Sequence, residues 1–239
     1  MISTILFDWD GCIVNSLPTW LSAYHTVLQN FATDISDKEI VSKLFGKWNA
    51  WESVGIPKKY VPLCNQELSR IVFDGIESTP LHTEVKETLG ELYELGVTMG
   101  VITTNRRKII ERHMHHLGIQ SLFDIVITAD DCSRHKPHPD PILKALDTLN
   151  SPGDKTLMIG DSQHDILAAK NAGIPNCIFY PEPNQLFYKR SELEALKPTY
   201  FIEQMSYLVS IAQKEKLPIP IVDELADDYI DGESIEDGE

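Results

Sequence analysis

The chain has 239 residues, a hydrophobic share of 42%, a charged share of 24% and a formal net charge of −15. This length suffices for one large domain, or for a core domain with a smaller insert. The negative charge argues against nucleic acid or an anionic membrane surface as a partner. No apolar stretch approaches the length of a membrane span. We therefore expect a globular protein that binds neither nucleic acid nor membranes.

The four cysteines are scattered along the chain and form no C-x-x-C pair; they are Cys12, Cys64, Cys132 and Cys177. This spacing argues against a zinc site and against a disulfide framework, and it fits a reducing compartment. The N-terminal residues show neither the basic nor the apolar region of a secretory signal. These features together predict a cytoplasmic protein.

Short apolar runs alternate with helical patterns. Each run is typical of a buried parallel strand with a polar residue at its carboxyl end; the runs are STILFDWD (3–10), VTMGVITTN (97–105), FDIVITAD (123–130), KTLMIGD (155–161) and NCIFYP (176–181). Helical patterns over 84–95, 107–117 and 164–172 are each followed by a glycine that would end the helix, and Thr83 would cap the first. The alternation predicts an α/β fold: a Rossmann-like parallel sheet with helices on both faces.

One interval, 17–79, contains helical patterns but no buried-strand run. It is far longer than the usual connection after a strand. We therefore expect a small α-helical cap at 17–79, inserted into a core of 1–16 and 80–215. The acidic residues 216–239 are expected to form a flexible tail. Small and proline residues near 15–18 and 78–82 would serve as hinges for cap motion.

Polar residues follow the predicted strands where each one ends. Since ligands bind outside the carboxyl ends of parallel strands, we expect these residues to meet; they are Asp8, Asp10, Thr103, Thr104, Asn105, Lys136, Asp161, Ser162 and Asp165. Converging carboxylates repel one another unless a cation offsets their charge, and magnesium suits carboxylates combined with phosphate. One carboxylate could attack phosphorus while a second transfers a proton. The pattern thus favours phosphoryl transfer.

Four segments together resemble the motifs of the haloacid dehalogenase-like hydrolase superfamily. They are FDWDG (7–11), VITTN (101–105), KPHPDP (136–141) and IGDSQHDILAAKNAG (159–173), in the family's order. The insert at 17–79 is similar to the helical cap of the branch that contains phosphoglycolate phosphatase and β-phosphoglucomutase. A lone D-x-D-G would be a weak signal, whereas the four motifs at strand ends are specific.

The resemblance implies a role for each matching residue. Asp8 would be the nucleophile, and Asp10 the general acid and base that also offers its backbone carbonyl to the metal. Thr104 would bind the phosphoryl group in preference to Thr103, and Lys136 would steady the phosphoaspartate. The implied Mg²⁺ ligands are Asp8, Asp10, Asp161 and, through water, Asp165. The residues expected to bind substrate or phosphate are Thr104, Asn105, Lys136, Gly11, Trp20 and Lys47.

Several of these residues have plainer interpretations. Asp165 could be an acid in the first turn of a helix that favours the helix dipole. Trp20 could pack inside the cap with Tyr24, four residues away on one helical face. The histidines His113, His115 and His116 are spaced as a solvated helix face and not as a metal site.

The resemblance implies a magnesium-dependent phosphatase that hydrolyses a small phosphorylated metabolite through a phosphoaspartate. A phosphomutase is the alternative. Cys12 stands where phosphatases carry a threonine, which favours a mutase, whereas Trp20 and Asn49 stand where the mutases carry histidine and arginine. A non-catalytic binding domain is the alternative from another class, but it should have lost a motif carboxylate, and all of them are present. The sequence leaves the oligomeric state open.

Overall fold

The computed structural model describes residues 1–47, 49–75 and 78–214. Six parallel strands form one sheet in the order β3-β2-β1-β4-β5-β6; they are β1 (Thr4–Phe7), β2 (Thr98–Ile102), β3 (Ile125–Ile127), β4 (Thr156–Gly160), β5 (Asn176–Phe179) and β6 (Tyr200–Ile202). The helices are α1 (Leu17–Gln29), α2 (Asp37–Lys43), α3 (Val61–Gly75), α4 (Val85–Glu94), α5 (Arg107–Leu117), α6 (Asp140–Leu149), α7 (Gln163–Ala172), α8 (Arg190–Glu194) and α9 (Tyr207–Gln213). The predicted α/β fold is confirmed.

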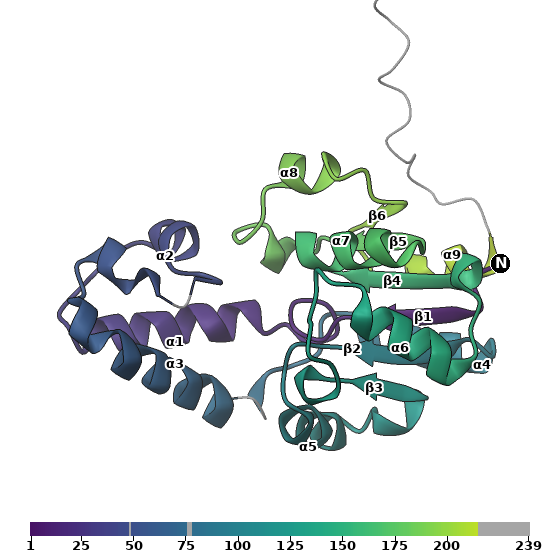
Figure 1. Cartoon of the computed structure of the whole chain (residues 1–239), viewed down its shortest axis with the longest axis horizontal. Coiled ribbons are helices and arrows are strands. Elements are labelled where there is room, and N and C mark those ends of the chain that lie inside the picture. The colour runs from purple at the N-terminus through teal and green to yellow at the C-terminus, as the bar shows by residue number, and fades with distance from the viewer. Residues whose placement is uncertain (48, 76–77, 215–239) are drawn as a thin grey trace, which may run out of the picture.

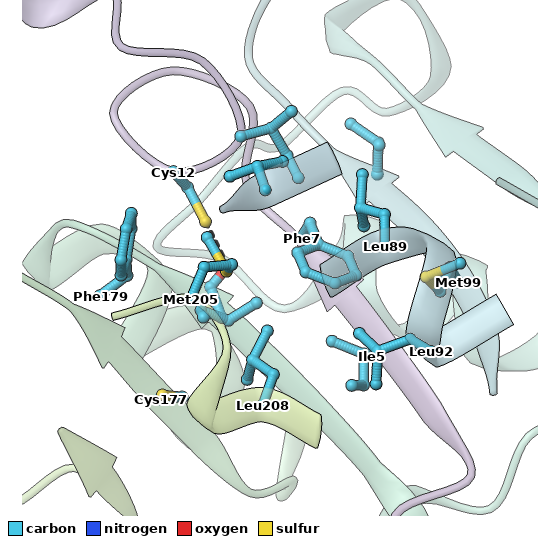
Figure 2. Close-up of a cluster of buried hydrophobic side chains, with 14 of the residues drawn as sticks. Ile5, Phe7, Cys12, Leu89, Leu92, Met99, Cys177, Phe179, Met205 and Leu208 are labelled. Carbon is cyan, nitrogen blue, oxygen red and sulfur yellow. Dashed lines mark hydrogen bonds between the residues drawn. The ribbon is translucent and has the colours of Figure 1, made fainter. Parts of the chain in front are cut away.

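Successive residues of a strand point to opposite faces of the sheet. Since the strand residues are apolar on both faces, helices cover both of them. In β1, Ile5 and Phe7 join the hydrophobic cluster beneath α4, α5 and α9, shown in Figure 2. Leu6, between them, joins a second cluster with α6 and α7. All three side chains are fully buried. The uninterrupted apolar run in the sequence therefore reflects a strand buried on both faces.

The structure departs from the sequence-based expectation at two places. The sixth strand, β6, was not expected, because it is only three residues long and Tyr200 and Phe201 are half-buried. Helix α4 begins at Val85 and is preceded by Glu84 in the left-handed conformation, so Thr83 is not its N-cap.

The glycines expected to end three helices, Gly96, Gly118 and Gly173, all adopt positive φ angles.

Helices α1, α2 and α3 lie to one side of the sheet and form a hydrophobic cluster of their own (Figure 1). Its largest fully buried side chain is Trp51, and the Tyr24 hydroxyl donates to the carbonyl of Leu44, 3.2 Å away. The chain enters and leaves this region side by side, since the Asn15 amide donates to the carbonyl of Pro80 at 2.9 Å. The tail expected at 216–239 lies outside the described residues.

The strand order places β1 and β4 side by side at the centre of the sheet. The chain adds β2 and β3 on one side of β1 and then crosses to the other side to form β4. This crossing is the switch point at which parallel α/β sheets form a crevice. Asp8 directly follows β1 and Asp161 directly follows β4, so the fold brings these two acids to the crevice.

Cys12 faces the hydrophobic interior. Its side chain is fully buried in the cluster of β1, near Phe179 and Met205 (Figure 2). The thiol donates a weak hydrogen bond to the carbonyl of Ile159, 3.8 Å away, and burial raises the pKa of the thiol well above its ordinary value. Cys12 therefore packs as a small apolar residue that stays protonated.

Replacing Cys12 with alanine should lower the free energy of unfolding by about 1 kcal/mol, because the change removes a buried atom from a close-packed cluster. Denaturant titration followed by circular dichroism measures this loss. The matched control is Cys132→Ala, since Cys132 is partly exposed and should cost less. Equal losses at both positions would contradict the packing role of Cys12.

Candidate active site

A cleft of about 1460 Å³ lies between the carboxyl edge of the sheet and helices α1 and α3. Asp8, Asp10, Thr104, Asn105 and Asp161 line it from the sheet side. Trp20 and Lys47 line it from the region expected to form the cap. The fold therefore brings residues from both predicted parts of the chain to one cavity.

Asp8 is held by one of its two carboxylate oxygens. Its Oδ1 accepts hydrogen bonds from the Trp9 amide at 2.7 Å and from the Lys136 ammonium at 2.6 Å. No described residue donates a hydrogen bond to Oδ2. The carboxylate is thus fixed in orientation while one oxygen stays available for chemistry.

Lys136 joins three segments of the core. Its ammonium lies 2.6 Å from both Asp8 and Asp165 and donates to the carbonyl of Ile102 at 3.0 Å. The side chain is only 5% exposed. Burial disfavours the ammonium, but the carboxylates of Asp165 and Asp8 outweigh this and raise the pKa of Lys136. Lys136 therefore carries a buried positive charge beside Asp8.

Asp165 is fully buried, and both of its carboxylate oxygens have protein donors. Oδ1 accepts from Lys136, while Oδ2 accepts from the Ser162 amide at 3.1 Å and the Ser162 hydroxyl at 2.6 Å. The contacts with Ser162 form a capping box at the start of α7. Gly160 makes room for this side chain, since a Cβ there would lie 2.2 Å from the Asp165 carboxyl carbon. Asp165 thus caps a helix and orients Lys136.

Asp161 packs directly against Gly11. A Cβ on Gly11 would lie 1.9 Å from Oδ2 of Asp161, and Gly11 has a φ of +72°. Only glycine satisfies both conditions without strain. Gly11 therefore permits the close approach of the loop after β1 to the carboxylate after β4.

Asp10 is bound by the motif that follows β2. The side-chain amide of Asn105 donates to Oδ2 of Asp10 at 2.5 Å, and burial raises the pKa of Asp10 above its ordinary value. A carboxyl with a raised pKa holds a proton more readily, as a general acid and base requires. Thr103 is buried, and its hydroxyl oxygen accepts a hydrogen bond from the backbone N–H of Asn105 at 3.1 Å. Thr104 is exposed and lines the cleft.

Three carboxylates crowd together at the base of the site. One oxygen from each of Asp8, Asp161 and Asp165 lies within 4.8 Å of the others. Burial, then the neighbouring Asp165 charge, raises the pKa of Asp8 to about 7. Burial and the Asp8 charge raise the pKa of Asp161 well above its ordinary value. The single ammonium of Lys136 does not offset three acids, so the cluster suits a divalent cation.

Two residues that sequence reasoning did not single out belong to the surroundings of Asp161. Asn184 is fully buried, and its Nδ2 donates to the Gly11 carbonyl at 2.8 Å. The same Nδ2 lies 3.4 Å from Oδ2 of Asp161. The Tyr188 phenol lines the cleft together with Asp161, and burial and then the Asp161 charge raise the pKa of this phenol well above its ordinary value. Both residues lie between β5 and β6, where no motif spacing marks them.

His113 is fully buried, so the expectation that it belongs to a solvated helix face is wrong. It shares the buried face of α5 with Ile110 and Met114, packs edge-on against Trp9 at 5.4 Å between ring centroids, and also lines the cleft. Its Nε2 lies 3.0 Å from the carbonyl of Thr79, where the chain returns from α3. His115 and His116 are exposed as expected. The three-residue spacing from Ile110 was the signal that His113 is buried.

Trp20 and Lys47 reach the cleft in different ways. Trp20 is partly buried and packs against the cluster of α1, α2 and α3 while its side chain also lines the cavity. The two interpretations of Trp20 therefore apply together. Lys47 is exposed, and its ammonium donates to the carbonyl of Ser42 at 2.7 Å.

Among the described residues, none of the helices combines the length and apolar character needed to cross a membrane.

A model of the haloacid dehalogenase-like hydrolase family matches residues 5–179. The pyrophosphatase PpaX of Bacillus mycoides is 30% identical over 216 residues, which cover 89% of this chain and 98% of that protein.

Solved structures show the same fold. A haloacid dehalogenase-like family hydrolase of Streptococcus pneumoniae has a TM-score of 0.74 at 21% identity, over 88% of this chain and 98% of that one. CbbY of Rhodobacter sphaeroides, solved in complex with phosphate, has a TM-score of 0.66 at 18% identity, over 87% and 96%.

The carboxylate cluster predicts how stability depends on pH and metal. The folded-state pKa of Asp8 lies above the ordinary value of 3.8. Its contribution to stability is therefore complete below that value and is lost as pH rises through about 7. A divalent cation needs ionised carboxylates and stabilises the protein that binds it. We expect Mg²⁺ to raise the melting temperature more at pH 8 than at pH 6. Each kcal/mol that binding adds to the free energy of unfolding should raise the melting temperature by about 2–4 °C.

Thermal melts in EDTA and in Mg²⁺ at both pH values test this expectation. The control variant Asp161→Asn removes one charge from the cluster and should reduce both the pH dependence and the effect of Mg²⁺. Equal Mg²⁺ shifts at pH 6 and pH 8 in the unaltered protein would contradict it.

Proposed function

Because the chain belongs to the haloacid dehalogenase-like hydrolases, we propose that it is a magnesium-dependent phosphatase that hydrolyses a small phosphorylated metabolite through a phosphoaspartate on Asp8. The observation that carries this proposal is the state of the Asp8 carboxylate. One oxygen is fixed by Trp9 and Lys136, while the other is available at a cleft that also contains Asp10 and Asp161. This arrangement suits nucleophilic attack followed by proton transfer.

The residues present fit a magnesium ion. Asp8 and Asp161 would hold it with the backbone carbonyl of Asp10, and Asp165 would act only through water because protein donors occupy both of its oxygens. When bound, the ion would neutralise phosphate charge and reduce the repulsion among the carboxylates.

Each remaining residue has a task in this reaction. Oδ2 of Asp8 would attack phosphorus while Thr104 and Lys136 hold phosphoryl oxygens. Asp10, oriented by Asn105, would give a proton to the leaving oxygen and then take one from the water that hydrolyses the phosphoaspartate. Lys136 would keep the Asp8 carbonyl oxygen in place during both steps.

We also propose that residues 17–79 form a cap that moves over the cleft, on the expected hinges at 15–18 and 78–82. The separate hydrophobic cluster of α1, α2 and α3 supports this division of the chain. A cytoplasmic location remains part of the proposal, supported by four cysteines that are all free.

The charges that line the cleft favour a substrate with more than one anionic group. Arg106 and Lys108 line the cleft, are exposed, and form no ion pair with any residue that the structure describes. Arg106 directly follows Asn105 and Lys108 comes two residues later, so both would lie near a phosphate held by Thr104. A related protein is named a pyrophosphatase. Diphosphate and doubly charged phosphate esters are therefore the first substrates to test.

The rival functions receive less support. No structural observation favours a mutase, because Cys12 faces the hydrophobic interior and its thiol contacts Ile159. A non-catalytic domain would have no need to keep an oriented carboxylate, a buried lysine and two further acids together at an open cleft.

Replacing Asp8 with asparagine should abolish phosphate release from phosphomonoesters and diphosphate, because the amide cannot form the acyl phosphate. Asp10→Asn should lower kcat by about 10²–10⁴-fold, the usual contribution of proton transfer. Phosphate release with Mg²⁺ present measures both changes. The matched control is Asp154→Asn, an exposed acid before the amino end of β4 and thus at the opposite edge of the sheet from the cleft, which should keep full activity. Equal activity in unaltered protein and Asp8→Asn would overturn the proposal.

Incubation with a sugar 1-phosphate followed by phosphorus NMR separates a phosphatase from a mutase. We expect inorganic phosphate as the product, because Trp20 and Asn49 stand where the mutases carry histidine and arginine. An isomeric sugar phosphate that forms faster than inorganic phosphate would show mutase activity instead.

A further inference from the structure

The segment Pro181–Lys189, between β5 and β6, forms a wall of the candidate active site. It begins with a short 3₁₀ turn at Glu182–Asn184 that contacts α1. Phe187 and Tyr188 line the cleft. The sequence motifs end at Gly173, so no motif accounts for the approach of this segment to the carboxylates.

Asn184 connects two parts of the site. Its Nδ2 donates to the Gly11 carbonyl at 2.8 Å and lies 3.4 Å from Oδ2 of Asp161. The side chain is fully buried, and its Oδ1 has no hydrogen-bond partner among the described residues. A buried, unpaired acceptor beside a carboxylate cluster is costly unless a ligand or water satisfies it. A water bound to a cation at Asp161 would do so.

Tyr188 supports the same carboxylate from the other end of the segment. Its phenol lines the cleft together with Asp161, and its backbone is fixed because the Tyr180 hydroxyl donates to the Tyr188 carbonyl at 2.9 Å. The neighbouring Phe187 points to a different partner, since its ring packs against Phe45 with 5.0 Å between centroids. Asn184 thus contacts Asp161, Tyr188 shares the cleft with that carboxylate, and Phe187 contacts Phe45, just after α2.

We propose that Asn184 and Tyr188 are positioning residues that hold the Asp161 carboxylate in the orientation needed to bind a divalent cation. Asp161 sits against Gly11 and is repelled by Asp8 and Asp165, so without these donors its carboxylate would turn away from the cluster. Hydrogen bonds of this kind orient metal ligands, and their loss commonly weakens metal binding 10–100-fold. This inference rests on the proposed function, in which Asp161 is a magnesium ligand.

Isothermal titration of the full chain with Mg²⁺, and with Mn²⁺ as a second probe, tests the inference without any assay of activity. We expect the cation Kd of Tyr188→Phe to rise about 10-fold or more, and that of Asn184→Ala to rise similarly. At saturating Mg²⁺, kcat should recover toward that of the unaltered protein, because the loss lies in cation binding and not in the chemistry of Asp8.

Two controls define the result. Tyr207→Phe removes a phenol hydroxyl from α9, where the ring packs against the cluster of β1, and should leave the cation Kd unchanged. Phe187→Ala alters the same segment but not its contacts with Asp161, so it should also leave the Kd unchanged. Asn184 is buried, and its variant could unfold; Tyr188→Phe keeps the ring and tests the inference by itself.

The outcomes separate the inference from the function on which it rests. If the unaltered protein binds Mg²⁺ and Tyr188→Phe binds it equally well, the inference is overturned and the proposed phosphatase stands. A lower melting temperature for Tyr188→Phe with an unchanged Kd would mean a merely structural role and would overturn it too. If the unaltered protein neither binds divalent cations nor releases phosphate, the proposed function itself fails.

Discussion

The repulsion among Asp8, Asp161 and Asp165 is the constraint on which the rest of the site depends. Three buried carboxylates within 4.8 Å destabilise a folded chain unless their charge is offset. Lys136 supplies one buried positive charge and contacts two of the acids at 2.6 Å. The net charge that remains explains why the site suits a divalent cation. Burial and then this remaining negative charge raise the pKa values of Asp8 and Asp161 when only protein groups surround them.

The geometry of the sheet makes this crowding possible. Parallel strands end at one edge, and the reversal of strand order beside β1 opens the crevice there. Gly11 and Gly160 then remove the Cβ atoms that would otherwise collide with Asp161 and Asp165. A larger residue at either glycine would separate the carboxylates, so the glycines belong to the site as much as the acids do.

The sequence predicted the parts of the site that follow directly from strands. Asp8 and Asp161 directly follow β1 and β4, so an apolar run followed by a polar residue was enough to identify them. Lys136 lies well beyond β3, and only the KPHPDP motif identified it. Asn184 and Tyr188 escaped prediction because tertiary packing alone brings them to the site, whereas the spacing of His113 from Ile110 did indicate that His113 is buried. The short strand β6 was missed for a similar reason, since its pairing with β5 defines it more clearly than its three residues do.

Asp165 shows how one side chain serves both fold and chemistry. Its contacts with Ser162 start α7, and its contact with Lys136 places the ammonium beside Asp8. The two interpretations of this acid, as a helix cap and as part of the metal site, are therefore compatible. Because both oxygens already have donors, a cation would reach Asp165 only through water.

Asn184 also has two tasks at its side-chain amide. Its Nδ2 donates to the Gly11 carbonyl, while its Oδ1 has no protein partner among the described residues. The outer contacts of the carboxylates thus determine which of them face a cation and which support the others.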